Sequence, residues 1–372
     1  MRLGVEAAVV DGELVDGDVT IEDGLVAAVG EQPAGRRGVA VPGFVDVHIN
    51  GVAGVDFLTA GPEEYRQAGE ALLRTGVVAY QPTFVSSAVG AYAEPLRTVE
   101  ELIRTEAPAG LPLIAGVHLE GPFLSPAWPG AHAPEHLREP DLELAQRLVA
   151  GGPVTMMTLA PERPRALDLI DWLVERDVVV SCGHTDADAA QAYAAYDRGA
   201  SAITHIHNAH RRWLPRDPGV GGAALVRPDV TVQAIVDGVH LAPESAYAAF
   251  LAAGRRFCLV TDSIEAGMML EPGEYVLGGR PVRVRDGAAR LPDGTLAGSV
   301  VTMDEALRNL VASGARLPDA VHAASGAPAR LLGRDDLGGL RPGAPAHLAV
   351  LDDELRVRRT FVGGVEAFSE WA

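Results

Sequence analysis

The stretch VPGFVDVHIN (residues 41–50) is an apolar run that ends near a side chain able to bind a metal, His48. Four later apolar runs repeat this pattern, ending on Glu120, His184, His205 and Asp262: LIAGVHLEGP (113–122), VVVSCGHTD (178–186), SAITHIHNAH (201–210) and FCLVTDS (257–263). In a (β/α)8 barrel each strand delivers polar residues to the active site at its C-terminal end. The repeated pattern therefore predicts an α/β fold built on a (β/α)8, TIM-like barrel.

The sequence between these runs supports the same fold, because strand-like and helix-like segments alternate. Glycine stands at the predicted end of each helical segment, where it favours a stop. Strands are predicted at residues 76–84, 111–121, 154–162, 177–186, 200–208, 230–240 and 256–263, and helices at 62–76, 187–199 and 302–314.

Both ends of the chain have a different pattern, with alternating apolar positions and DG turns. Residues 1–42 predict short strands in a small antiparallel unit, and residues 341–372 have the same character. We therefore expect the two ends to build one small β-sandwich domain together, with the barrel spanning residues 43–340. A further β-rich stretch, residues 273–298, is expected either to extend that domain or to form a flap.

Charge and composition exclude several classes of function. The formal net charge is −19, which argues against nucleic acid or an anionic membrane as a partner. All 31 basic residues are arginine. The absence of lysine excludes a carbamylated-lysine metal bridge, a Schiff-base lysine and a Walker-type phosphate lysine. An anionic substrate would therefore have to be bound by arginine, histidine or backbone N–H groups.

No apolar run reaches the roughly 18–20 residues that a membrane span needs. The N-terminal stretch carries acidic residues and glycines, so we do not expect a signal peptide. Cys182 and Cys258 both lie inside apolar runs, which fits buried free thiols in a reducing cytoplasm.

The residues at the strand ends indicate a metal-dependent hydrolase. Glu120 follows an apolar run, where a carboxylate is costly to bury without a cation. His184 and His205 end two successive strands and complete a ligand set for one divalent metal. Asp262 is the candidate general acid/base, since a carboxylate beside such a metal can move the proton of a water. Two residues after His48 stands Asn50, a weak ligand, so His48 would join at most a weaker second metal site.

These stretches together resemble the N-acetylglucosamine-6-phosphate deacetylases of the amidohydrolase superfamily over nearly the whole chain. The ordered set of motifs is specific, although each motif alone is weak. It comprises PGFVDVHINGVAGVDF (42–57), HLEGPF (118–123), TLAPE (158–162), GHTDA (183–187), TH..NA (204–209), PRDPG (215–219), DGVH (237–240), LVTDS (259–263), LAGSVVTM (296–303) and PGAPAHLAVLD (342–352).

The resemblance implies a role for each matching residue. Glu120, His184 and His205 would hold the main metal. Asp262 would act on the water and then on the departing amine, and His132 would polarise the acetamide carbonyl. The sugar phosphate would be bound by Asn208, the backbone of Ala209, His240, and Arg216 of the second subunit of a homodimer.

Several features stay open at this level. Histidine and carboxylate ligands suit zinc, our first expectation, but also iron, manganese and cobalt. Trp128 and Pro129 replace a basic pair of the family, and His210 follows Asn-Ala where methionine is usual. The galactosamine epimer or another N-acyl substrate therefore remains an alternative, as does a different barrel amidohydrolase such as a D-aminoacylase.

Overall fold

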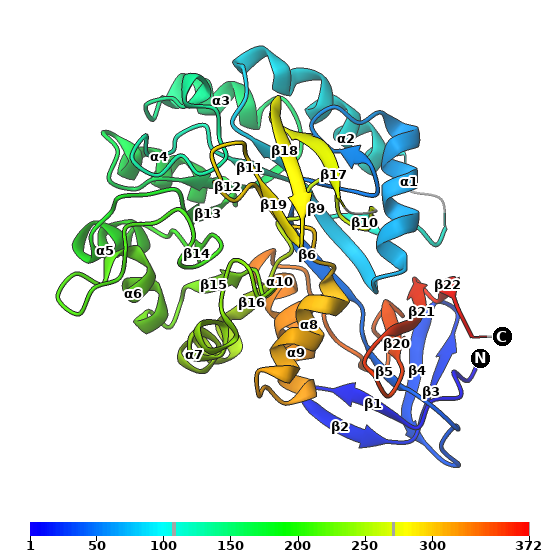
Figure 1. Ribbon diagram of the computed structural model, residues 1–372. Coiled ribbons are helices and arrows are strands. Elements are labelled where there is room, and N and C mark those ends of the chain that lie inside the picture. The colour runs from blue at the N-terminus through cyan, green and yellow to red at the C-terminus, as the bar shows by residue number, and fades with distance from the viewer. Residues whose placement is uncertain (106–108, 270–271, 372) are drawn as a thin grey trace.

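The structure is a computed structural model that describes residues 1–105, 109–269 and 272–371. Within these residues, eight parallel strands follow one another around a barrel (Figure 1). The ring is closed between its first and last strands, where the Asp262 N–H donates to the His48 carbonyl over 2.8 Å. The strands are β6 (Phe44–Ile49), β9 (Val77–Val85), β11 (Val117–Glu120), β12 (Val154–Leu159), β13 (Val179–Cys182), β14 (Ala202–Ile203), β15 (Thr231–Ala234) and β16 (Phe257–Leu259). The predicted barrel is confirmed.

Helices surround this ring of strands (Figure 1). The three predicted from the sequence are present, and Gly76, Gly199 and Gly314 follow them with positive φ, as expected of helix stops. The helices are α1 (Pro62–Leu73), α2 (Ala93–Arg104), α3 (Leu142–Val149), α4 (Ala166–Val174), α5 (Ala189–Asp197), α6 (Gly219–Val226), α7 (Pro243–Ala253), α8 (Met303–Ala312), α9 (Leu317–Ala324) and α10 (Gly326–Leu331), with short 3-10 turns at Val89–Tyr92, Pro134–His136 and Gly254–Arg256.

The two ends of the chain lie together in a small β-sandwich beside the barrel (Figure 1). One sheet has the order β2-β1-β5-β20-β21-β22, and β3 and β4 pair separately. A second apolar core joins both ends, with Val5, Val19 and Phe361 fully buried. The strands are β1 (Ala7–Val10), β2 (Glu13–Asp16), β3 (Asp18–Glu22), β4 (Leu25–Glu31), β5 (Val39–Pro42), β20 (Leu348–Leu351), β21 (Val357–Val362) and β22 (Val365–Ser369).

One detail of this prediction was wrong. Residues 1–42 do not form a purely antiparallel unit, because β1 and β5 pair in parallel. The intervening β3 and β4 form their own hairpin, so the chain returns beside β1 in the same direction. The ranges proposed for the two domains stay predictions.

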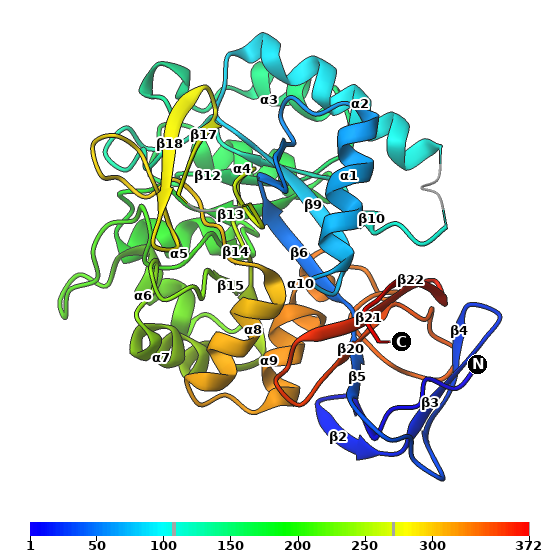
Figure 2. The same cartoon turned by 45° about the vertical axis from the view of Figure 1, so that its right-hand side comes forward.

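The β-rich stretch near residues 273–298 forms a separate antiparallel sheet of β17 (Gly273–Leu277), β18 (Arg280–Arg285) and β19 (Ala288–Arg290). We call these three strands the flap. Figure 2 shows the flap far from the terminal sheets, so it does not extend them. Its buried side chains pack on Val85 and Ile264, next to the C-terminal ends of β9 and β16. Two short elements complete the description: β10 (Leu113–Ile114), and the pair β7 (Gly51–Val52) and β8 (Val55–Asp56).

The main apolar core is formed by buried residues of the strands and the surrounding helices, and both cysteines lie in it as free thiols. Burial raises the pKa of each thiol, which keeps both protonated. Among the described residues, no helix is long and apolar enough to cross a membrane.

Candidate metal centre and active site

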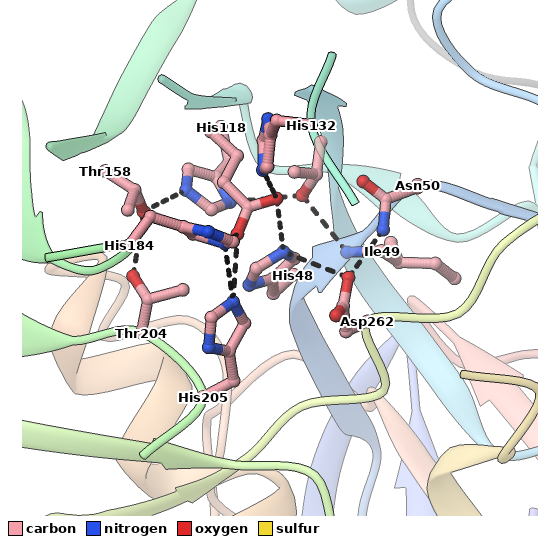
Figure 3. Close-up of polar contacts among 12 residues, drawn as sticks. His48, Ile49, Asn50, His118, His132, Thr158, His184, Thr204, His205 and Asp262 are labelled. Atoms are coloured by element: carbon pink, nitrogen blue, oxygen red, sulfur yellow. Dashed lines mark hydrogen bonds and ion pairs between the residues drawn. The ribbon is translucent and has the colours of Figure 1, made fainter. Parts of the chain in front are cut away.

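Three side chains from different strands converge at the C-terminal end of the barrel. Oε1 of Glu120, at the end of β11, lies 3.1 Å from Nε2 of His184 and 3.0 Å from Nε2 of His205. The two histidine nitrogens are 3.2 Å apart (Figure 3). All three residues are at least 95% buried. The structure thus brings together the three residues that the sequence predicts as metal ligands.

The local backbone explains how the histidines reach this point. Both lie just beyond the ends of β13 and β14, and both have positive φ, 48° at His184 and 27° at His205. A Cβ at Gly183 would lie 2.7 Å from atoms of Thr158 and Thr204, so only glycine lets the chain approach its neighbours here.

The donor set fits a divalent metal. Tetrahedral bonds of about 2.0–2.2 Å place neighbouring ligand atoms about 3.3 Å apart, close to the separations seen here. His184 Nδ1 faces the Trp128 carbonyl at 3.0 Å, which assigns the Nδ1 proton and leaves an Nε2 lone pair facing Glu120. Two imidazole nitrogens and a carboxylate oxygen directed at one point are a donor set that a divalent cation can bind.

A second group of potential ligands adjoins the first. His48 Nε2 lies 3.2 Å from Oδ1 of Asp262 and 3.6 Å from Oε2 of Glu120. Nδ2 of Asn50 donates to the same Asp262 oxygen over 2.6 Å (Figure 3). His48, Glu120 and Asp262 could therefore hold a second ion, while Asn50 is directed at Asp262 through its amide nitrogen, which is no ligand.

The charges at the site favour ionised carboxylates. Burial opposes ionisation of Glu120, but the charge of His48 and the hydrogen bond of His132 help to outweigh it, and the pKa of Glu120 is held well below its usual range. At Asp262 burial is likewise outweighed by the charge and hydrogen bond of His48, so the pKa of Asp262 is lowered. An ionised Asp262 beside a cation site can accept a proton.

His132 faces the same centre from the loop after β11. Its Nδ1 accepts the backbone N–H of Ser86 over 3.1 Å. The remaining proton is therefore on Nε2, which lies 3.3 Å from Oε2 of Glu120. His132 thus presents an N–H donor to the metal site, as a group that polarises a carbonyl must.

These side chains open into a cavity of about 380 Å³. The flap covers part of it, because Leu277 and Gly278 at the tip of its hairpin belong to the lining. The lining also includes Asn208, Ala209 and His240, all three predicted to bind substrate.

His240 is held in a defined orientation. Its Nδ1 lies 2.7 Å from Oδ2 of Asp237, and the His240 backbone N–H donates to Oδ1 of the same carboxylate over 2.7 Å. Burial works against ionisation of Asp237, but these hydrogen bonds outweigh it and lower its pKa. With Nδ1 donating to the carboxylate, Nε2 of His240 is left to accept a hydrogen bond.

Arg216 is the predicted site residue that the structure does not bring to the cavity. It lies on an exposed loop between β14 and α6. Among the described residues, no arginine lines the cavity.

Some residues at the site were missed from the sequence. His118 lies beneath the ligands, with Nδ1 3.1 Å from Thr83 Oγ1 and Nε2 2.8 Å from Thr158 Oγ1 (Figure 3). The period of two along β11 could have found it, because His118 and Glu120 share a face. The buried ring of His210 also stacks on His205, with centroids 5.8 Å apart.

Comparison with known proteins agrees with this geometry. The sequence profile of the amidohydrolase family matches residues 39–367. An N-acetylglucosamine-6-phosphate deacetylase of Bacillus subtilis is 35% identical, covering 97% of this chain and 96% of its own length. The chain belongs to the N-acetylglucosamine-6-phosphate deacetylase family of amidohydrolases.

Other members of this amidohydrolase family are equally similar. An N-acetylgalactosamine-6-phosphate deacetylase of Escherichia coli O157:H7 is 33% identical over 95% of each chain. A mutant N-acetyl-D-glucosamine-6-phosphate deacetylase from Mycobacterium smegmatis, solved in complex with N-acetyl-D-glucosamine-6-phosphate, superposes with a TM-score of 0.93. It is 35% identical, with 99% of both chains covered.

Proposed function

We propose that this protein hydrolyses the N-acetyl group of N-acetylglucosamine 6-phosphate, giving glucosamine 6-phosphate and acetate, with the help of a divalent metal. The observation that carries the proposal is the convergence of Glu120, His184 and His205 beside Asp262 and His132 in one cavity. Relatives that are N-acetylglucosamine-6-phosphate deacetylases support an amino-sugar phosphate as the substrate.

Glu120, His184 and His205 are the proposed ligands of the main metal, and zinc is the proposed ion, with iron, manganese and cobalt as alternatives. A metal bound there would lower the pKa of a water and polarise the acetamide carbonyl. We propose one ion at full occupancy. His48 would contribute only to a weaker second site, since Asn50 directs its amide nitrogen at Asp262.

The chain's own residues would move the protons of the reaction. Asp262, held by Asn50, takes a proton from water as the oxygen attacks the acetyl carbon. His132 donates its Nε2 proton in a hydrogen bond to the carbonyl oxygen, which gains charge in the transition state. Asp262 then returns the proton to the amine nitrogen as the C–N bond breaks. Acetate and the free amino sugar leave.

The sugar phosphate is proposed to be contacted by Asn208 and the backbone N–H of Ala209, with His240 also reaching the ligand. We further propose that Arg216 of a second subunit completes this site, which makes the active protein a homodimer. A bidentate guanidinium at close range outweighs a distant acidic surface, because salt screens charges beyond about 8–10 Å. A protein with free thiols and such a metabolite as its substrate is expected to work in the cytoplasm.

The galactosamine epimer is the second candidate, because the Escherichia coli relative carries that name at similar identity. Acetate release from both N-acetylhexosamine 6-phosphates and from the unphosphorylated sugars separates these proposals. We expect fast release from the glucosamine phosphate and slow release from the others. Fast release from the galactosamine phosphate alone would change the sugar and keep the reaction, whereas a metal-loaded protein inert on all of them would refute the proposed substrate.

A further inference from the structure

Arg280, the first residue of β18 in the flap, contacts the loop that carries His132. Its Nη1 donates to the backbone carbonyls of Ala131 and His132, over 3.2 and 3.4 Å. These two carbonyls belong to consecutive residues, so one guanidinium nitrogen holds the peptide that ends at His132. The contact links parts of the chain that are nearly 150 residues apart.

Besides these carbonyls, the charge of Arg280 acts at longer range on the exposed carboxylate of Asp293. The ion pairs of the flap include Arg283 with Glu274, but none for Arg280. Arg283 lies on the same strand with 76% of its side chain exposed, whereas Arg280 is half-buried. A half-buried guanidinium that forms no close ion pair relies for its hydrogen bonds on the carbonyls that it contacts. Those carbonyls are in the loop of the active site.

The loop in question, residues 125–133, is tightly folded against the metal ligands. The Trp128 N–H donates to the Ser125 carbonyl and the His132 N–H to the Pro129 carbonyl, each over 3.0 Å. At Gly130, a Cβ would lie 2.8 Å from the ring of His184. A shift of this loop therefore moves the His132 donor relative to the metal site.

The flap that bears Arg280 also forms part of the roof of the cavity. Leu277 and Gly278, just before Arg280, line the cavity. Leu277 is buried in a cluster with Val85 and Ala131. The hairpin tip is closely seated, since a Cβ on Gly278 would lie 2.9 Å from Val85. The roof and the His132 loop thus share one small set of contacts.

We propose that Arg280 is a positioning residue that couples the flap to His132. When the flap is seated over the cavity, Arg280 fixes the peptide before His132 and so places the Nε2 donor for the carbonyl of the substrate. The inference rests on the proposed deacetylation for its kinetic consequence, but the coupling itself is a property of the fold.

The test compares Arg280→Met, Arg280→Lys and the matched control Arg283→Met. We expect Arg280→Met to lower kcat about tenfold with KM changed less than about threefold, as for loss of a hydrogen bond felt in the transition state. Arg280→Lys should restore part of kcat, and Arg283→Met should behave as the parent. Bound metal should be the same in all four proteins.

A double-mutant cycle with His132→Ala shows whether Arg280 acts through His132. In that background Arg280→Met should cause no further loss of kcat, since the donor that it places is gone. Losses that multiply would overturn the proposal. A rise in KM confined to phosphorylated substrates would overturn it as well, because Arg280 would then bind the phosphate directly.

Hydrogen exchange of the intact protein gives a readout that does not need activity. Arg280→Met should speed exchange of the amides of Trp128 and His132, and Arg283→Met should not. If the parent released no acetate from any amino-sugar phosphate, the proposed function would fail while faster exchange still supported the coupling. Unchanged exchange in Arg280→Met would refute the coupling whatever the substrate.

Discussion

The two ends of the barrel handle left-handed backbone in different ways. At the base, the turns before β9, β11 and β14 have Gly76, Gly116 and Gly199 at positive φ. At the mouth, Gly121 also has positive φ, but so do His207 and four residues proposed to do chemistry or bind substrate: His184, His205, Ala209 and Asp262. Asp177, before β13, is an exception at the base, and aspartate tolerates this region better than most residues.

This difference shows where the protein accepts backbone strain. A residue with a side chain costs about 1–2 kcal/mol in the left-handed region, and glycine avoids the cost. At the base nothing but the turn is needed, so glycine suffices. At His184, His205 and Asp262 the side chain itself is required, because a ligand or a base has to leave its strand at a fixed angle. Strain of this kind collects at functional sites when the surrounding structure maintains it.

The largest expected effect is loss of turnover at the mouth. Asp262→Asn keeps the shape of the side chain and removes the base, so kcat should fall by about 10²–10⁴-fold. Bound metal should be retained, because Glu120, His184 and His205 are unchanged. Steady-state kinetics and metal analysis of one preparation check both points; a variant that has lost its metal would make Asp262 a ligand and not only a base.

The next largest effect is expected at Arg216, which lies outside the barrel mouth of its own chain. Arg216→Ala should raise KM for the phosphorylated sugar by about ten- to a hundredfold and leave kcat nearly unchanged, as for loss of a charged contact to a bound group. The unphosphorylated sugar is the control, since its KM should not move. If KM values of mutant and parent were the same for both sugars, Arg216 would have no part in phosphate binding.

The two ends can be compared directly by exchanging glycine and alanine. Gly199→Ala at the base should destabilise the fold by about 1–2 kcal/mol, since the position has φ of 98° and the new Cβ would lie 3.0 Å from Val174. Ala209→Gly at the mouth should change stability by less than about 1 kcal/mol but lower kcat/KM, because the backbone that meets the substrate becomes looser. Denaturant unfolding and kinetics give the two values. Equal losses of stability at the two positions would contradict the comparison.

The smallest effect concerns the pH dependence of stability far from the mouth. His322, on α9, has its pKa lowered to about 4 by burial and by the charge of Arg255. The folded protein therefore keeps His322 neutral, while the unfolded chain takes up a proton below its usual value of 6.5. The stability that the folded protein gains from a neutral His322 is fully present above about pH 6.5 and is lost as pH falls towards 4.

His322→Gln should accordingly flatten the change of Tm between pH 6.5 and about 4.5. Its kcat at pH 7 should match that of the parent, because His322 is remote from the cavity lining. A slope as steep as that of the parent would show that other groups set the pH dependence.

Much of this architecture could be predicted from the sequence, because it depends on local patterns. Apolar runs ending on Glu120, His184 and Asp262 predicted both the strands and the side chains that meet at their ends. The place of the flap could not be predicted, since an antiparallel hairpin has the same alternation wherever it packs. Nor could the role of Ser86, which holds His132 through a backbone N–H that any residue but proline offers.

The central claim is that Glu120, His184 and His205 form a metal site on which hydrolysis depends. Protein stripped with a chelator should release no acetate from N-acetylglucosamine 6-phosphate. On titration with zinc, activity should return in proportion to bound metal and level off at about one ion per chain. The same titration of Glu120→Gln should restore little. Full acetate release by the stripped protein, or recovery in Glu120→Gln equal to that of the parent, would contradict the account.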